Sequence, residues 1–276
     1  MMEWLGRIGT EGLLGIPPAW LPAAGFLALM ILLALAELAR PLHLAPVEGK
    51  GRLTANFGLG ILNALLFAAL PLSTLLAAEW ARLHQTGLTH WLAFPAWAPI
   101  ALTLLLRSLA NYGLHRAAHA VPLLWRLHRV HHCDTAVDLS TGLRHHPGEV
   151  LYVAVVLAAL AILCGFSVPA LAGYELAAAI FALLTHANLR LPGWLDTSLG
   201  WLFATPALHH VHHSSSRAET DSNYGECLIL WDRLFGSYRR LGPDALRATR
   251  FGLGDAHDGD APRLLAQLAA PLKRSE

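Results

Sequence analysis

Charged residues are scarce in this chain. Asp, Glu, Lys and Arg make up 14% of the 276 residues, whereas 55% of the residues are hydrophobic. Soluble domains usually carry about 25% charged residues, so this sequence has too little polar surface for water and suits a lipid bilayer. The formal net charge is only +1, which argues against a nucleic-acid partner because such a partner requires a basic face.

Cysteine is also scarce, and the motifs of several enzyme classes are missing. The three cysteines, Cys133, Cys164 and Cys227, show no CxxC spacing, so we expect free thiols and a reducing compartment. The sequence contains no HExxH motif, which argues against a metalloprotease, and no GxSxG or P-loop motif.

Long apolar runs are abundant instead. Residues 21–39 are almost wholly apolar, and about 20 such residues span the hydrocarbon core of a bilayer. The run is too long for the apolar part of a cleaved signal peptide, so we interpret it as a retained membrane helix. Further membrane segments are expected at residues 56–79, at residues 100–114, and in a tight helical hairpin formed by residues 150–168 and 169–184.

These segments predict an all-α membrane protein. We expect about four to five membrane-embedded helices under a cytoplasmic, histidine-rich helical cap. In this topology 17 of the 20 Lys and Arg residues lie on one side of the membrane. The positive-inside tendency makes that side cytoplasmic, so the histidines and the C-terminus are expected there.

Histidine is the residue present in excess. Twelve of the 16 histidines lie between His115 and His213, in the boxes HRAAH (115–119), HRVHH (128–132) and HHVHH (209–213). Residues three and four apart share one face of a helix. Adjacent residues diverge by about 100°, so each His-His pair can serve two neighbouring metal ions. Imidazole suits iron, zinc, copper and nickel, and ligand type alone does not name the metal.

The number of histidines says more about the site than their type. A zinc site uses three or four protein ligands, whereas the three boxes supply eight candidates with His210 left aside, and two further histidines flank the predicted hairpin. This total fits two metal ions. The predicted metal ligands are His115, His119, His128, His131, His132, His146, His186, His209, His212 and His213. His43, His84, His90 and His257 are expected to be ordinary surface or core residues.

Six segments together resemble one family of proteins. HRAAH, WRLHRVHHCD, TGLRHHPGE, THANLRLP, HHVHHS and SNYGECLILWDRLFGSYR look like the fatty acid hydroxylase/sterol desaturase superfamily of integral-membrane, histidine-box di-iron oxygenases. The resemblance covers roughly residues 103–239. It implies a non-haem centre of two Fe ions that activates O2 to hydroxylate or desaturate a lipid.

The resemblance also implies a domain organisation and partners. Residues 1–100 would form N-terminal membrane helices, residues 101–240 the catalytic domain, and residues 241–276 a cytoplasmic tail. The substrate would be a membrane lipid such as a sterol or a fatty acyl lipid. No haem-binding or flavin-binding segment is evident, so electrons would come from a separate donor such as a ferredoxin or a cytochrome b5-like protein.

Two histidines depart from the family pattern. His145 stands where an aromatic residue is usual before His-Pro, and His210 is an additional histidine in the last box. The family spacing favours His146 over His145 and His209 over His210. No catalytic residue beyond the metal ligands is predicted.

Side chains near the boxes are expected to accept the second ring N–H of the ligands and so orient them. The candidates are Asp134, Asp138, Glu149, Asn188, Asp221, Asn223 and Asp232, with Asp134 and Asn223 favoured because they lie near the boxes. Other functions stay open. A carotenoid hydroxylase or an alkane monooxygenase uses similar boxes, and a zinc-dependent membrane hydrolase or a metal transporter would also need histidines.

Overall fold

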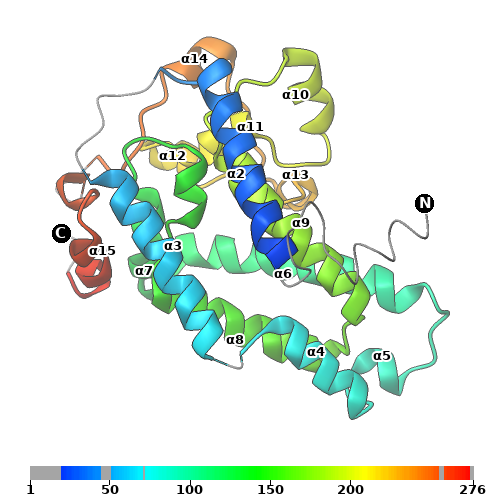
Figure 1. Ribbon diagram of the computed structural model, residues 1–276. Helices are drawn as coiled ribbons and strands as arrows, with labels where there is room; N and C mark the ends of the chain where they lie inside the picture. Colours follow the sequence, from blue (N-terminus) through cyan, green and yellow to red (C-terminus); the bar gives the residue numbers. More distant parts are fainter. Residues whose placement is uncertain (1–19, 45–50, 71, 255–257, 274–276) are drawn as a thin grey trace.

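The computed structural model describes residues 20–44, 51–70, 72–254 and 258–273. Helices make up 69% of the described residues, and no β-strand occurs within those ranges. This confirms the predicted all-α class. Figure 1 shows how the long and the short helices are arranged. His257 lies outside the described residues.

Four helical segments are long and apolar enough to cross a membrane. They are α2 (Leu21–Ala39), the stretch Arg52–Trp91, α8 (Pro147–Cys164) and α9 (Val168–His186). Large apolar side chains on their outer faces are exposed, among them Leu38, Ile61 and Leu176. Because water would not tolerate such a surface, these helices belong in a bilayer, and the chain is an integral membrane protein.

The second of these segments differs from the single membrane segment predicted over residues 56–79. The stretch contains α3 (Arg52–Ala69), α4 (Thr74–Leu83) and α5 (Leu88–Trp91). Leu70 is extended, with φ −106° and ψ 130°, because the residue before a proline is driven out of the helical region. Ser73 then caps α4 by accepting a hydrogen bond from the Leu76 N–H at 3.0 Å.

Helix α6 (Ala98–Ala120) contains the expected segment at residues 100–114 and continues to the first histidine box. It is not among the four most apolar segments of the described chain, because it carries Arg107, Ser108 and Asn111 in its middle. Val121 is extended, and α7 (Pro122–His132) starts at once with a proline in its first turn. The two histidine helices are therefore joined by a sharp turn.

The predicted hairpin is present as α8 and α9. Gly165 ends α8 in the left-handed conformation, with φ +67°, which glycine adopts without steric cost. The chain then returns along α9, so that His146, before α8, and His186, at the end of α9, both lie at the end of the hairpin that faces α7.

The remaining elements are short helices. They are η2 (Leu139–Leu143), α10 (Gly193–Leu199), α11 (Pro206–His212), α12 (Arg217–Thr220), α13 (Leu230–Phe235), α14 (Pro243–Arg247), η3 (Asp258–Asp260), α15 (Leu264–Ala269) and η4 (Ala270–Leu272). In Figure 1, α11 and α12 lie between the long helices and other short helices such as α14.

A buried polar network joins α3 to the segment after α7. Arg52 donates hydrogen bonds to Asp134 at 2.9 Å and to the Ala136 carbonyl at 2.7 Å. Asn56 donates to the same Asp134 carboxylate at 2.9 Å, and it accepts from Arg144 at 2.7 Å. Further hydrogen bonds offset the cost of burying such a pair, and the Asp134 Oδ2 accepts three of them, from Arg52, Asn56 and the Thr141 hydroxyl.

The described part of the C-terminal segment packs against α7 and the residue that follows it. Arg129 of α7 donates to the carbonyl of Ala270, and the Cys133 thiol donates to Gln267 at 3.0 Å. Within the described chain all three cysteines are free thiols, as predicted. The C-terminal segment therefore supports α7 directly.

Candidate metal centre

Nine of the ten predicted ligands come together in two groups. The first group is His115, His119, His128, His132 and His212, and the second is His131, His186, His209 and His213. Within each group, one ring nitrogen from every residue lies within 4.8 Å of all the others. Helices α6, α7 and α11 supply the first group, whereas α7, α9 and α11 supply the second.

Adjacent histidines diverge into different groups. His131 joins the second group and His132 the first, and His213 and His212 are divided in the same way. This division follows from the angle of about 100° between neighbouring side chains on a helix. Helices α7 and α11 therefore each serve both groups, and they hold the groups next to each other.

The ring nitrogens of each group converge on a common point. In the first group the His132 Nε2 lies 3.1 Å from that of His119 and 3.2 Å from that of His128. In the second group the His186 Nε2 lies 3.0 Å from those of His131 and His209. Nitrogen lone pairs that face one another in this way are the arrangement expected around a cation.

Burial keeps these imidazoles neutral. It lowers the pKa of His131, His132 and His212 well below the usual 6.5, and nearby histidines lower it further. The neutral ring is the form that binds a metal. The Nε2 atoms of His115 and His212 are buried and accept no hydrogen bond from the described residues. A metal ion would satisfy these orphaned atoms, so the residues fit a metal site.

Fixed acceptors hold the opposite ring nitrogens. The Nδ1 atoms of His115, His128, His131, His186 and His212 face the Tyr224 carbonyl (2.8 Å), the Glu149 carboxylate (2.6 Å), the Arg144 carbonyl (3.0 Å), the Ala182 carbonyl (2.6 Å) and the Ser222 carbonyl (2.7 Å). An acceptor at Nδ1 keeps the proton there and turns Nε2 toward the centre.

Only two of the predicted orienting side chains contact a ring in this way. Glu149 faces His128, and Asp221 lies 3.2 Å from the His119 Nδ1. The prediction for Asp134 and Asn223 is wrong. Asp134 accepts from Arg52, Asn56 and Thr141, and the Asn223 amide donates to the carbonyls of Leu208 and Arg239.

Asp138, Asn188 and Asp232 likewise bond elsewhere. Asp138 caps η2 through the Ser140 N–H at 2.8 Å, and Asn188 binds the backbone of His43. Asp232 accepts the N–H groups of Tyr224 and Gly225, and so shapes the loop whose Tyr224 carbonyl faces His115. Three of the carbonyls that face a histidine ring, those of Tyr224, Arg144 and Ser222, lie in loops. The composition of a loop does not predict which of its carbonyls will face a ring.

His146 lies outside both groups. Its Nδ1 accepts the Gly148 N–H at 3.0 Å as a cap of α8, and its Nε2 lies 3.2 Å from the Leu268 carbonyl. His145 stands closer, with its ring stacked on His131 at a centroid distance of 4.3 Å. It also forms a third cluster with His128 and Glu149. The geometry therefore places His145, and not His146, beside the second group.

His210 has a separate environment. Its Nε2 donates to the His186 carbonyl at 3.0 Å, and its ring stacks on His43 with a centroid distance of 5.1 Å. Burial lowers the pKa of His210 to about 3. The residue thus supports the end of α9, and His43, which was expected to be an ordinary residue, packs against it.

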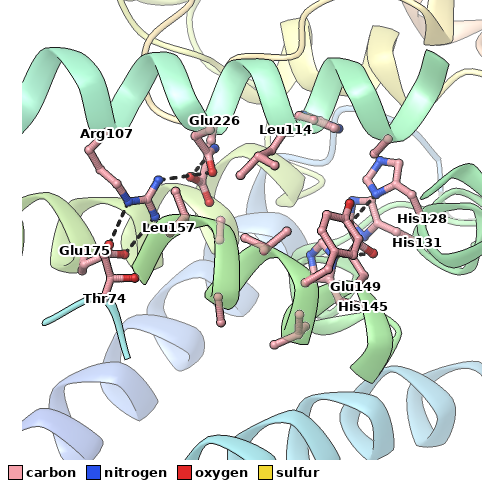
Figure 2. A pocket seen from close by; sticks show the side chains of 18 of the residues that line it. Thr74, Arg107, Leu114, His128, His131, His145, Glu149, Leu157, Glu175 and Glu226 are labelled. Atoms are coloured by element: carbon pink, nitrogen blue, oxygen red, sulfur yellow. Dashed lines mark hydrogen bonds and ion pairs between the residues drawn. The ribbon is translucent and has the colours of Figure 1, made fainter. Parts of the chain in front are cut away.

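A cavity of about 410 Å³ opens onto the histidines. The rings of His115, His128, His131, His186 and His209 line one end, and Leu114 and Leu157 line the middle. Arg107, Asn111, Glu175 and Glu226 also line the cavity, and Figure 2 shows Arg107, Glu175 and Glu226 at the opposite end from His128 and His131. This cluster was not predicted from the sequence, although an ionisable residue in an apolar helix is itself a signal of function.

Fold and site together define an integral membrane protein with a buried histidine centre beside an apolar cavity. A profile of the fatty acid hydroxylase family matches residues 100–237, the part of the chain that carries all nine converging histidines. The chain belongs to the fatty acid hydroxylase family, as the sequence resemblance implied.

Individual relatives share this part of the chain. The ornithine lipid hydroxylase OlsE of Rhizobium tropici is 34% identical over 178 residues, which cover 63% of this chain and 50% of the relative. The alkylglycerol monooxygenase of Xenopus tropicalis is 30% identical over 200 residues, or 68% of this chain and 42% of the relative. The chain thus spans half or less of the length of these relatives. No solved structure matches it.

Proposed function

We propose that this protein is a membrane-bound oxygenase that hydroxylates a lipid with O2 and electrons from an external donor. The observation that carries the proposal is the joint arrangement of two groups of converging imidazoles and one apolar cavity that reaches both. Hydroxylation is preferred to desaturation, because the matched relatives are named a hydroxylase and a monooxygenase. Insertion of one oxygen atom consumes O2, two electrons and two protons, and it yields the alcohol and water.

The donor set favours two iron ions. Groups of five and four imidazoles exceed the needs of one ion, and nitrogen ligands suit iron among other metals. When bound there, two iron ions would supply the redox chemistry that activates O2. The nine histidines that converge are the proposed ligands, and His145 is the proposed addition to the second group in place of His146.

The surrounding residues prepare this site for chemistry on a C–H bond. The Nδ1 acceptors fix ring tautomer and orientation before the metal arrives. Apolar side chains such as Leu114 and Leu157 exclude water, which protects a reactive centre from side reactions. Glu149 faces the cavity as well as His128, so its carboxylate both orients a ligand and borders the place where the substrate carbon would lie.

The remaining parts of the proposal concern topology and partners. Residues 101–240 would be the catalytic domain, preceded by membrane helices in residues 1–100 and followed by a supporting segment in residues 241–276. The histidines would face the cytoplasm, since most Lys and Arg residues lie on their side. A ferredoxin or a cytochrome b5-like protein would deliver the electrons.

Metal analysis and product analysis test this proposal together. The purified protein should hold two iron ions per chain, and membranes that contain it should form a hydroxylated lipid under air but not under argon. In ¹⁸O2 the label should enter the product. Activity under argon would favour a zinc-dependent hydrolase, and metal flux into vesicles without a lipid product would favour a transporter. A different product, from a carotenoid or an alkane, would redirect the substrate class.

A further inference from the structure

We propose that the polar cluster at the far end of the cavity is a substrate subsite, where Glu226 accepts a hydrogen bond from an amine or a hydroxyl group of the lipid. This inference rests on the proposed function and names its substrate class. The cluster consists of Arg107, Asn111, Glu175 and Glu226, all on the cavity wall. Lipids with a phosphate or a carboxylate at this position would be rejected.

Hydrogen bonds fix the positions of these four side chains. The Arg107 guanidinium binds both oxygens of Glu175, with Nε–Oε1 at 2.8 Å and Nη2–Oε2 at 3.1 Å. The same guanidinium lies over the ring of Tyr174, at 4.9 Å from its centroid. Asn111 Nδ2 donates to Glu226 Oε2 at 2.7 Å. Figure 2 shows Glu175 and Glu226 on either side of Arg107.

The charges of the cluster do not balance. It contains two carboxylates and one guanidinium, and a bidentate pair already joins the guanidinium to Glu175. Glu226 receives its hydrogen bond from a neutral amide, although a charged group in an apolar cavity is costly unless it is paired. Burial raises the pKa of Glu226, in agreement with this cost. A cationic or hydrogen-bond-donating group from the substrate would satisfy the carboxylate.

The position of the cluster fits a lipid that reaches from it to the histidines. Arg107, Asn111 and His115 are spaced by four residues, so they lie along one face of α6. At 1.5 Å per residue, the eight residues from Arg107 to His115 span about 12 Å. Leu114 and Leu157 line the wall between the two ends. The polar group would therefore fix which carbon lies beside the metal centre.

A binding experiment on three matched lipids tests this inference. Metal-loaded protein in detergent is titrated under argon and without reductant, with lipids of one chain length that end in an amine, a hydroxyl or a carboxylate. The amine or the hydroxyl lipid should bind about tenfold or more tightly than the carboxylate, because a hydrogen bond to a charged group would be gained rather than lost. Equal binding of all three would overturn the proposal.

The substitution Glu226→Gln separates an amine from a hydroxyl. Glutamine keeps the size and the acceptor oxygen, so an amine lipid should lose about tenfold in affinity through loss of the charge, whereas a hydroxyl lipid should keep most of it. Unchanged affinity for every lipid would contradict the inference. Glu79→Gln is the matched control, since Glu79 is exposed and pairs with Arg82 away from the cavity.

Two further measurements keep the result interpretable. If Glu226→Gln fails to fold, as judged by metal content and thermal unfolding, the ranking of the three lipids on the unaltered protein still decides. In the presence of O2 and a donor, a series of amine lipids with longer chains should be hydroxylated at the same carbon counted from the amine. Binding without any product would refute the proposed function alone. Product from every lipid regardless of its polar end would refute the subsite alone.

Discussion

The Nε2 atoms of His186 and His131 lie 3.0 Å apart, although 55 residues separate them in the chain. His131 lies in the last turn of α7, and His186 is the last residue of α9, the second helix of the hairpin that begins at Pro147. The hairpin therefore passes into the membrane and returns, and it places the ligand His186 beside His131 of α7. The position of a ligand supplied by such a hairpin depends on how α9 packs against its neighbours. The second group is therefore sensitive to substitutions that are distant from it in sequence.

The two groups should lose metal independently when one ligand of each is removed. His131→Ala in the second group and His212→Ala in the first should each abolish turnover, because a two-ion centre needs both ions to activate O2. Iron analysis should give a lower iron content for each variant than for the unaltered protein. His84→Ala is a suitable control, since His84 bonds the Trp80 carbonyl away from the centre. Near-normal turnover of either ligand variant would remove that residue from the ligand set.

His145 and His146 should behave differently. His146→Ala removes the side chain that caps α8, so it should keep its metal and lose about 1 kcal/mol of stability, the usual effect of a lost cap. His145→Ala removes a ring stacked on His131 and should lower the iron content of the second group. Iron analysis and thermal unfolding of both variants distinguish the two roles. The opposite pattern would restore His146 as a ligand.

Interactions between residues close together in the chain made much of the fold predictable. The apolar run of α2, the break at Pro122 and the division of each His-His pair between two groups follow from neighbours in the chain. The break after α3 was missed, although the proline that follows Leu70 provides a local reason for it. Asp134 was misassigned for a different reason, because its partner Arg52 lies 82 residues away and only the packed fold brings the two together.

The polar end of the cavity was not predicted for the same reason, because its residues are far apart in sequence. Arg107 and Glu175 each interrupt an apolar helix, but their ion pair joins residues 68 positions apart. Sequence spacing along α6 does place Arg107 and Asn111 on the face of His115. That alignment, combined with the cost of a charge in an apolar helix, was the available signal.

Replacement of Glu149 should weaken the first group without removing a ligand. The Glu149 carboxylate faces the His128 Nδ1 at 2.6 Å, and Glu149→Gln keeps the shape while removing the charge. Loss of such an orienting partner typically costs about 10- to 100-fold in metal affinity or activity. Titration of iron against a competing chelator measures the effect. Glu219→Gln, at a carboxylate that bonds Ser214 and not a ring, should bind iron normally.

Gly142 should be intolerant of even one added methyl group. A Cβ at this position would lie 2.4 Å from the Ala182 carbonyl oxygen, closer than unbonded atoms can approach. The same oxygen faces the His186 Nδ1 at 2.6 Å, so Gly142→Ala would push on the atom that orients a second-group ligand. We expect a lower iron content and loss of most activity.

Gly173→Ala, on the helix α9 that carries Ala182 and His186, provides the control. Nothing lies within 4 Å of a Cβ built on Gly173, and alanine stabilises a helix by about 0.5–1 kcal/mol relative to glycine. This variant should therefore unfold at a slightly higher temperature and keep its iron. If Gly142→Ala also keeps its iron and its activity, the His186 ring does not depend on the close approach of η2 to α9. The Ala182 carbonyl would then hold the His186 Nδ1 without support from η2.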